Sequence, residues 1–328
     1  MLRAGIARKS FLVIGRVGMD LSPDPVGTPT RHATSMMVAM GGSSANIAAG
    51  LVKLGCGASL VTAVSDDSVG WYCLNQLDHY GIGRQHVKRI TGEYRTSLAV
   101  YETRVEEHQS VIYRNNAADF QMDIADVEAI DYGQFGALIT TGTVFAAEPS
   151  RSAAFRALDL AREAGLPIIF DIDYRPYSWP SARVAQDVLS RAGALSDMVV
   201  GNDEEFGFMV GNRADGLNTA RRLARENAEI VVYKMGPQGA VTFAENREIR
   251  TGIYPVKALK PTGAGDSFMA GLLASLADGL PIRDAVLRGS ACASIVVAKP
   301  GCAPAMPDLA ELAHFLSSHP GPTANPED

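Results

Sequence analysis

Cysteine is scarce in this sequence, which has only Cys56, Cys73, Cys292 and Cys302 among 328 residues. This number and scatter exclude a disulfide framework and a zinc site. The six histidines also lack the spacing of a metal-binding helix. We therefore expect the cysteines to be small buried apolar residues of a protein from a reducing compartment, the cytoplasm.

Long hydrophobic runs and an excess of positive charge are absent as well. The apolar run that starts at Phe11 is interrupted by Arg16, so it is too short for a signal sequence or a membrane span. The formal net charge is -6 at pH 7, which argues against nucleic acid as a partner. A small phosphorylated ligand stays possible because it needs only a local positive site.

Short apolar runs alternate with segments of helical period along the chain. The runs predicted to be strands cover residues 11–15, 59–64, 137–141, 167–170, 197–201 and 230–234. The predicted helices lie near 44–54, 68–80, 150–164, 181–193 and 216–227. This order predicts an α/β fold with a mostly parallel sheet that is covered by helices on both faces.

Two segments, at about 18–40 and 94–116, alternate polar and apolar residues instead. They predict antiparallel strands that form a small β lid, because neither segment could build a core of its own. The chain is then a single domain over 1–318 with a flexible tail at 319–328, which is rich in proline, glycine and acidic residues. An exposed lid could pair with a second copy, so we expect a homodimer formed through it.

The strongest local signal is the run Pro-Thr-Gly-Ala-Gly-Asp that ends at Asp266. Its glycines expose backbone N–H groups at the start of a helix, where an anion can bind. Asp266 lies at the same end, where it could deprotonate a hydroxyl that attacks a phosphoryl group. Taken alone, an aspartate in such a run is more often a helix N-cap than a base.

Further segments add to this signal. Asp20 lies just beyond the first predicted strand, where open α/β sheets bind ligands. The run Gly-Gly-Ser-Ser-Ala-Asn that ends at Asn46 opens another helix. With the run Asn-Asp-Glu-Glu at 202–205 and the loop at 234–239, these segments resemble the ribokinase-like (PfkB) family of carbohydrate kinases. The two signatures of that family fall on 41–70 and 261–273, and the resemblance covers 10–318.

The resemblance implies a ribokinase-like three-layer α/β/α fold and an ATP-dependent kinase with an alcohol acceptor. It implies Asp266 as the base and an anion hole formed by Gly263, Ala264 and Gly265. It implies that the acceptor is held by Asp20, Gly41, Gly42 and Asn46. It places the nucleotide against Asn202, Lys234, Gly236, Gly239 and Thr262, and Mg²⁺ with its waters against Asn202 and Glu205. By spacing alone, Asn202 and Glu205 would more often be a capping box.

Two arginines bear on the identity of the acceptor. Arg114 lies in the predicted lid, and Arg175 follows Asp173 just beyond a predicted strand. Because guanidinium binds carboxylate bidentately, these residues predict an acidic sugar derivative that is held by Arg114, Asp173 and Arg175. The alternative is that the arginines pair with acids such as Asp173 or stabilise the lid. A neutral nucleoside would leave both arginines unexplained, and a binding protein without chemistry would not need the complete set of motifs.

One position departs from the family pattern. Ribokinase itself has an acidic residue six positions before the catalytic aspartate, where it contributes to a monovalent-cation site. This chain has Lys260 at that position. An ammonium group would repel K⁺, so we expect Lys260 to supply a fixed positive charge in place of the ion.

Overall fold

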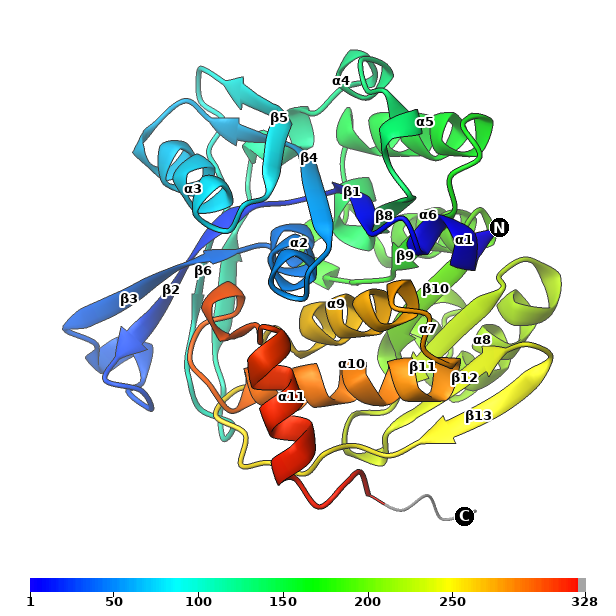
Figure 1. Ribbon diagram of the computed structural model, residues 1–328. Helices are drawn as coiled ribbons and strands as arrows, with labels where there is room; N and C mark the ends of the chain where they lie inside the picture. The colour runs from blue at the N-terminus through cyan, green and yellow to red at the C-terminus, as the bar shows by residue number, and fades with distance from the viewer. Residues whose placement is uncertain (324–328) are drawn as a thin grey trace.

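The computed structural model describes residues 1–323, and the last part of the tail predicted at 319–328 lies outside the described residues. A nine-stranded sheet forms the centre of the molecule, in the order β13-β12-β11-β10-β9-β8-β1-β4-β5 (Figure 1). Its strands are β1 (Ser10–Ile14), β4 (Gly57–Ser65), β5 (Gly83–Ile90), β8 (Ala137–Thr141), β9 (Ile168–Asp171), β10 (Met198–Asn202), β11 (Ile230–Lys234), β12 (Ala240–Ala244) and β13 (Arg247–Thr251).

All neighbouring strands from β5 to β11 are parallel, and only β12 and β13 run antiparallel to their neighbours. The mostly parallel sheet predicted from the sequence is therefore confirmed. Each of the predicted apolar runs forms one of its strands. β5, β12 and β13 were not predicted.

Two layers of helices cover the sheet, and the side chains of β1 pack alternately against one layer and the other. Phe11 and Val13 pack into one apolar core, whereas Leu12 and Ile14 pack into the other, because successive side chains of a strand point to opposite faces. The first core is closed by α1 (Leu2–Ile6), α2 (Ser43–Lys53), α3 (Ser68–His79), α9 (Ala264–Ala277), α10 (Ile282–Val297) and α11 (Leu309–Ser318). The second is closed by α4 (Ile124–Glu128), α5 (Ser150–Glu163), α6 (Ala182–Ala194), α7 (Asp203–Met209) and α8 (Gly216–Glu226).

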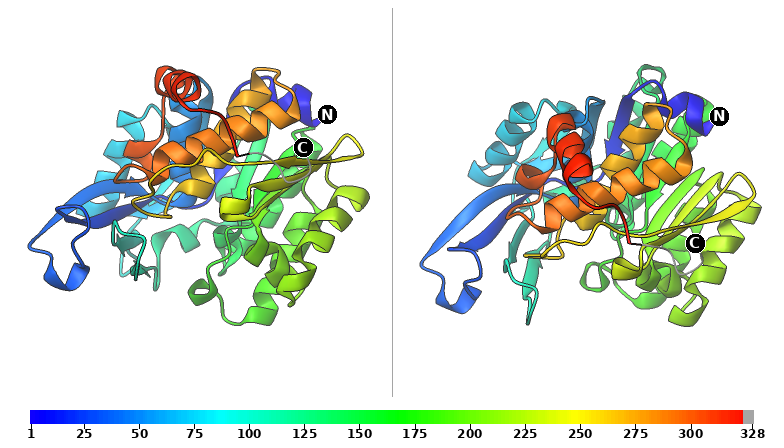
Figure 2. Two further views of the ribbon diagram at one scale, coloured as in Figure 1. Left: turned by 90° about the horizontal axis from the view of Figure 1, so that it is seen from below. Right: turned by 60° about the horizontal axis from the view of Figure 1, so that its bottom comes forward.

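A separate four-stranded sheet, here called the lid sheet, is formed by β2 (Gly18–Asp24), β3 (Ser35–Gly41), β6 (Leu98–Tyr101) and β7 (Ser110–Tyr113), in the order β3-β2-β6-β7. β2 pairs antiparallel with β3 and parallel with β6, and β6 pairs antiparallel with β7. Figure 2 shows this sheet extending from one side of the α/β core. Because β2 follows β1 directly, the lid sheet begins at the carboxyl edge of the central sheet.

Two further observations concern the cysteines and the length of the helices. All four cysteines are free and buried, as expected for apolar packing. Within residues 1–323, no helix combines the length and the apolar character that crossing a membrane requires.

Candidate active site

The predicted site residues come from elements that meet at the carboxyl edge of the sheet. Asp20 lies on β2, Asn46 on α2, and Asp266 in the first turn of α9. Asp173 follows β9, and Lys234 ends β11. The charges of Asp173, Lys234 and Arg175 all act on the pKa of Asp266, so these groups lie within electrostatic range of its carboxylate.

Asp266 is held by a direct contact with α2. The Asn46 amide Nδ2 donates to Asp266 Oδ2 at 2.8 Å. Burial raises the pKa of Asp266 to about 6, and the nearby Asp173 adds to the rise. The hydrogen bond from Asn46 and the charges of Arg175 and Lys234 oppose it. A carboxylate with this pKa is ionised at pH 8 and still takes up a proton readily, which suits a general base.

The start of α9 provides a positive environment next to Asp266. Gly263 is the N-cap of the helix and has a left-handed φ of 83°, which leaves the first N–H groups of the helix without side-chain caps. The Lys234 ammonium lies 3.4 Å from the point that a Cβ on Gly265 would occupy. Backbone dipoles and an ammonium group therefore meet where a transferred phosphoryl group would carry negative charge.

The opposite side of the site is shaped by Asp20 and Gly41 on neighbouring lid strands. A Cβ on Gly41 would lie 1.8 Å from Asp20 Oδ1, so only glycine lets the two strands place that carboxylate here. Burial raises the pKa of Asp20 to about 7; Arg16 opposes the rise and Asp266 adds to it. The buried Asn46 Oδ1 has no hydrogen-bond partner, so it can accept from a ligand hydroxyl.

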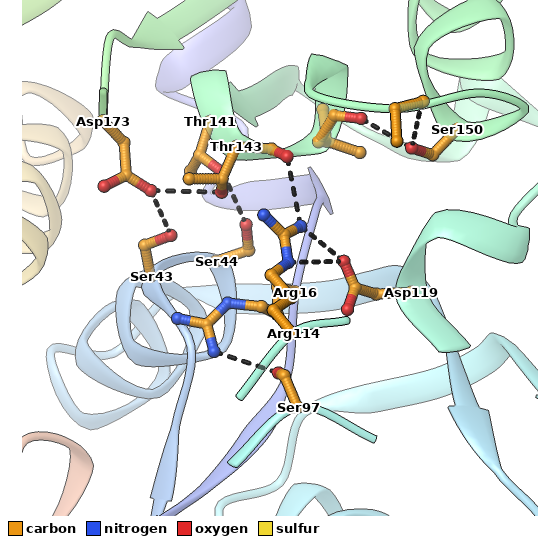
Figure 3. Close-up of polar contacts among 12 residues, drawn as sticks. Arg16, Ser43, Ser44, Ser97, Arg114, Asp119, Thr141, Thr143, Ser150 and Asp173 are labelled. Atoms are coloured by element: carbon orange, nitrogen blue, oxygen red, sulfur yellow. Dashed lines mark hydrogen bonds and ion pairs between the residues drawn. The ribbon is translucent and has the colours of Figure 1, made fainter. Parts of the chain in front are cut away.

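Both arginines predicted for the acceptor are paired with acids. Arg175 Nη2 lies 2.9 Å from Asp173 Oδ1, and Ser43 donates to Asp173 Oδ2 at 2.7 Å. Arg114 Nε donates to Asp119 Oδ2 at 3.2 Å and its Nη2 to the carbonyl of Thr143 at 3.1 Å (Figure 3). The ion pairs that the sequence left open as an alternative are thus present, although Arg114 Nη1 is buried without a partner.

Asn202 and Glu205 form a capping box at the start of α7. Glu205 N donates to Asn202 Oδ1 at 2.9 Å, and Asn202 N donates to Glu205 Oε2 at 2.8 Å. Burial raises the pKa of Glu205, and the charges of Lys234 and Arg175 oppose the rise. The capping role is therefore real, and it leaves Glu205 Oε1 available to a further ligand.

The residues present fit Mg²⁺ in the way that kinases use it. Within residues 1–323, no group of three or more His, Cys, Asp or Glu side chains could hold a metal by itself. Mg²⁺ keeps waters and phosphate ligands and needs only one or two carboxylates from the protein. Glu205 and Asp171 can supply them, because Asp171 ends β9 and lies in electrostatic range of Glu205. Burial raises the pKa of Asp171 to about 8; the charge of Glu205 adds to this rise and that of Lys234 opposes it.

Of the residues predicted for the nucleotide, Asn202 ends β10, and Lys234, Gly236 and Gly239 lie at or just beyond the end of β11. Gly236 and Gly239 flank the short turn after β11, and Gly236 faces open space. The carbonyl of Thr262 accepts from Lys260 Nζ at 2.7 Å. A neighbouring cavity of about 470 Å³ contacts Asn202, Glu205, Arg175, Tyr174, Pro176, Gln186, Glu204, Gly207, Phe208, Gly211, Asn212 and Arg213. Neither Asp266 nor Asp20 lines it.

Sequence reasoning did not assign roles to Arg16, Asp171 or Thr143. Each follows or ends a strand at the carboxyl edge of the sheet: Arg16 after β1, Thr143 after β8 and Asp171 at the end of β9. This position was the available signal, because ligands of open α/β sheets bind along that edge.

Comparison with known proteins identifies relatives over nearly the whole chain. The family model of pfkB family carbohydrate kinases matches residues 8–309. The 5-dehydro-2-deoxygluconokinase of Geobacillus kaustophilus is 35% identical over 314 residues, which cover 94% of this chain and 94% of the relative. The 5-dehydro-2-deoxygluconokinase of Photobacterium profundum is 34% identical over 313 residues, with 94% of each chain covered.

Solved structures agree with the sequence relatives. A PfkB protein from Polaromonas sp. JS666 has a TM-score of 0.80 and 28% identity, covering 93% of this chain and 99% of its own. A fructokinase double mutant from Vibrio cholerae O395, with fructose, ADP and potassium bound, has a TM-score of 0.83 and 26% identity, covering 94% and 98%. The predicted ribokinase-like fold is confirmed, and this chain belongs to the pfkB family of carbohydrate kinases.

Proposed function

We propose that this protein transfers the γ-phosphoryl group of ATP to the 6-hydroxyl of 5-dehydro-2-deoxy-D-gluconate, the reaction of inositol catabolism, with Asp266 as the general base. The observation that carries the proposal is the position of Asp266 in the uncapped first turn of α9, bonded to Asn46 and in electrostatic range of Asp20. Sequence relatives named 5-dehydro-2-deoxygluconokinase support the acceptor, and the ADP-bound fructokinase supports the nucleotide. A setting in the cytoplasm, where ATP is available, agrees with four free cysteines.

In this mechanism the acceptor lies beneath the lid sheet, and its hydroxyl loses a proton to Asp266. Asp20 and the free Asn46 Oδ1 accept hydrogen bonds from other hydroxyls and fix the orientation of the acceptor. Lys234 and the N–H groups of Gly263, Ala264 and Gly265 stabilise the charge on the transferred group. Asn202 and Glu205, with Asp171 nearby, would hold Mg²⁺ through water, and the bound ion would supply positive charge against the phosphates.

The nucleotide would lie along the carboxyl ends of β10 and β11. Asn202 ends β10, Lys234 ends β11, and the turn between Gly236 and Gly239 follows directly; the family resemblance adds Thr262 to this set. The open space around Gly236 allows a ligand to approach the backbone. On the acceptor side, Gly41 and Gly42 serve the same purpose where β3 joins α2.

A second acceptor, 2-keto-3-deoxygluconate, is also a sugar acid, so the arginine residues that favour the first acceptor favour it as well. Arg175 is paired with Asp173 and Arg114 with Asp119, while the buried Nη1 of Arg114 has no hydrogen-bond partner, and the carboxylate of any sugar acid would suit this donor. A neutral sugar makes less use of it, because burying charged groups is costly without a matching ligand. The carboxylate is thus common to both candidates.

The test is an assay of ATP turnover by the purified protein with Mg²⁺ and a panel of acceptors. We expect kcat/KM for 5-dehydro-2-deoxygluconate to exceed the values for fructose, ribose and adenosine by about 10²-fold or more, since a site with buried polar groups rejects ligands that leave them unpaired. A higher value for 2-keto-3-deoxygluconate would favour the second candidate. Preference for a neutral sugar or nucleoside would contradict the proposal.

We also propose that the protein is a homodimer formed through the lid sheet. The strand registers place Val38, Leu21, Val100 and Val111 in one row across the sheet, on the face opposite Asp20. Val38 is 51% exposed and Val111 is 46% exposed. An apolar sheet face of this kind is typical of a contact with another protein surface, and a second copy supplies a matching one.

Light scattering should give the wild-type protein about twice the chain mass of 34.8 kDa. The double variant Val38→Asp/Val111→Asp should be a monomer, because two charges per subunit would be buried without partners. Val105→Asp is the matched control, since Val105 is 56% exposed but lies in the loop between β6 and β7. A monomeric wild type, or a dimer that survives the double substitution, would rule out this interface.

A further inference from the structure

Arg16 is a buried arginine whose charge is not neutralised by a contact. Only 7% of the residue is exposed, yet it makes no ion pair within residues 1–323. Its Nη1 donates to Ser97 Oγ at 3.0 Å, which is a neutral partner (Figure 3). Burial of a guanidinium without an ion pair is costly, so Arg16 is suited to bind the anionic group of a ligand.

The main chain of Arg16 contacts the start of α2, the helix that carries Asn46. The carbonyl of Arg16 accepts a hydrogen bond from Ala45 N at 3.2 Å, and Ala45 directly precedes Asn46 on α2. The charge of Arg16 lowers the pKa of Asp20, whereas the charge of Asp266 raises it. Both groups therefore lie within electrostatic range of Asp20.

Arg114 contributes a second unsatisfied donor to the same space. This residue is 8% exposed, and its Nη1 is buried with no hydrogen-bond partner. Figure 3 shows Arg114 directed at Asp119 and Thr143, Arg16 directed at Ser97, and Asp173 bonded to Ser43 and Thr143 in the same region. Desolvation raises the pKa of Tyr177, and the charges of Arg175, Arg16 and Arg114 all oppose that rise, so the three guanidinium groups lie within electrostatic range of one phenol.

The three arginines differ in how far their charge is already balanced. Arg175 is paired with Asp173, and Arg114 is paired with Asp119. Only Arg16 retains a full charge without an acid in contact. A ligand anion in this space would therefore complete the bonding of Arg16 and of Arg114 Nη1 without displacing an existing ion pair.

We propose that Arg16, together with the free Nη1 of Arg114, binds the carboxylate of the acceptor and determines the preference for a sugar acid. This assignment rests on the proposed function and adds a residue to it. Arg175 acts as a positioning residue, because its guanidinium holds Asp173, which in turn accepts hydrogen bonds from Ser43 and Thr143. The acceptor thus spans the site, with its reacting hydroxyl at Asp266 and its carboxylate at Arg16.

The test compares Arg16→Gln with wild type on two acceptors, the sugar acid that wild type prefers and its analogue with an alcohol in place of the carboxylate. We expect KM for the acid to rise by about 10- to 100-fold, the range of a lost charge-assisted hydrogen bond. The values of kcat and of KM for ATP should stay within about threefold, because the base and the nucleotide site are unchanged. For the alcohol analogue, kcat/KM should also change by less than about threefold.

The thermal midpoint of the ligand-free variant separates binding from a structural role. Arg16→Gln should be as stable as wild type or more stable, because it removes an unpaired buried charge. Arg84→Gln, on the exposed strand β5, is the matched control and should leave KM and kcat/KM unchanged for both acceptors. An equal loss for acid and alcohol, an unchanged KM for the acid, or a rise in KM for ATP alone would overturn the assignment.

Two further outcomes keep the inference separate from the proposed function. If Arg16→Gln does not fold, Arg16→Lys carries the same comparison, with a rise of about tenfold in KM for the acid because the fork of donors is lost. If wild type prefers a neutral sugar, the proposed function fails first. If wild type prefers the acid and the variants keep that preference undiminished, only the role of Arg16 fails.

Discussion

Replacement of Asp266 by Asn is expected to lower kcat by about 10²- to 10⁴-fold, the range that a positioned general base contributes. The substitution preserves the shape of the side chain and its contact with Asn46, so the first turn of α9 should keep its geometry. Because burial raises the pKa of Asp266 in the folded protein, the ionised carboxylate costs folding free energy at pH 8. The neutral amide removes that cost, and the thermal midpoint should not fall.

Asp284→Asn is the matched control, since Asp284 also lies in the first turn of a helix but is exposed on α10. Both variants are compared with wild type by steady-state turnover and thermal unfolding. Turnover by Asp266→Asn within about tenfold of wild type would show that another group takes the proton.

The same pKa makes the activity of wild type depend on pH. A base must be ionised, so kcat/KM should fall about tenfold for each pH unit below about 6, the pKa of Asp266, and level off above it. The buried Asp20, with a pKa of about 7, can broaden this limb. The pH profile of kcat/KM between pH 5 and 8 reports the titration of Asp266 and of Asp20. A value of kcat/KM that stays constant down to pH 5 would contradict the assignment of the base.

The second large effect is expected from Lys260→Met. Lys260 is fully buried, and its Nζ donates to the carbonyls of Thr262 and Val296 at 2.7 and 3.2 Å. It thereby ties the loop that precedes the anion hole to α10. Loss of both contacts should let this loop shift, and we expect kcat to fall by about 10- to 100-fold, somewhat less than removal of an anion-hole donor costs.

The stability of Lys260→Met should change less than its activity. Burial lowers the pKa of Lys260, although Cys302, Asp266 and Asp20 favour its charged form. Methionine of similar size removes the desolvation cost of the ammonium, which offsets part of the two lost hydrogen bonds. Lys257→Met, at an exposed position of the same segment, is the control for both readouts.

Lys260 also predicts how wild type responds to monovalent cations. A related fructokinase has been solved with potassium bound. In this chain an ammonium group already donates to backbone carbonyls, the ligands that a potassium ion would use. Exchange of Na⁺ for K⁺ should therefore alter wild-type turnover by less than about twofold. A rise of several-fold would mean that a cation site exists despite Lys260.

The strands that sequence reasoning missed have physical reasons for being missed. β5 is the edge strand of the sheet, and its partly exposed, polar sequence lacks the apolar run of a central strand. β12 and β13 form a hairpin whose turn residues, Glu245 and Asn246, both have positive φ angles of 54° and 58°. Turns of this kind usually carry glycine, so Glu-Asn gave no hairpin signal.

Local spacing predicted some contacts but not their full meaning. Asn202 and Glu205 are three positions apart, and the capping box that this spacing indicates is present. Whether Glu205 also serves a metal depends on Asp171 and Lys234, which belong to other strands. Likewise, the proximity of Arg175 to Asp173 in sequence allowed an ion pair or a ligand site, and the structure shows the ion pair.

By itself the sequence determined the parallel sheet, the family and the position of Asp266, because these depend on local properties. An apolar run makes a buried strand, and a glycine-rich run makes a helix start that exposes N–H groups. Only the tertiary structure decided which of the three arginines has no ion pair with an acid. Arg114 is balanced by Asp119 and Arg175 by Asp173, whereas Arg16 reaches only Ser97, 81 positions away. Electrostatic interactions depend on distance in space, and folding alone sets the distances between such remote segments.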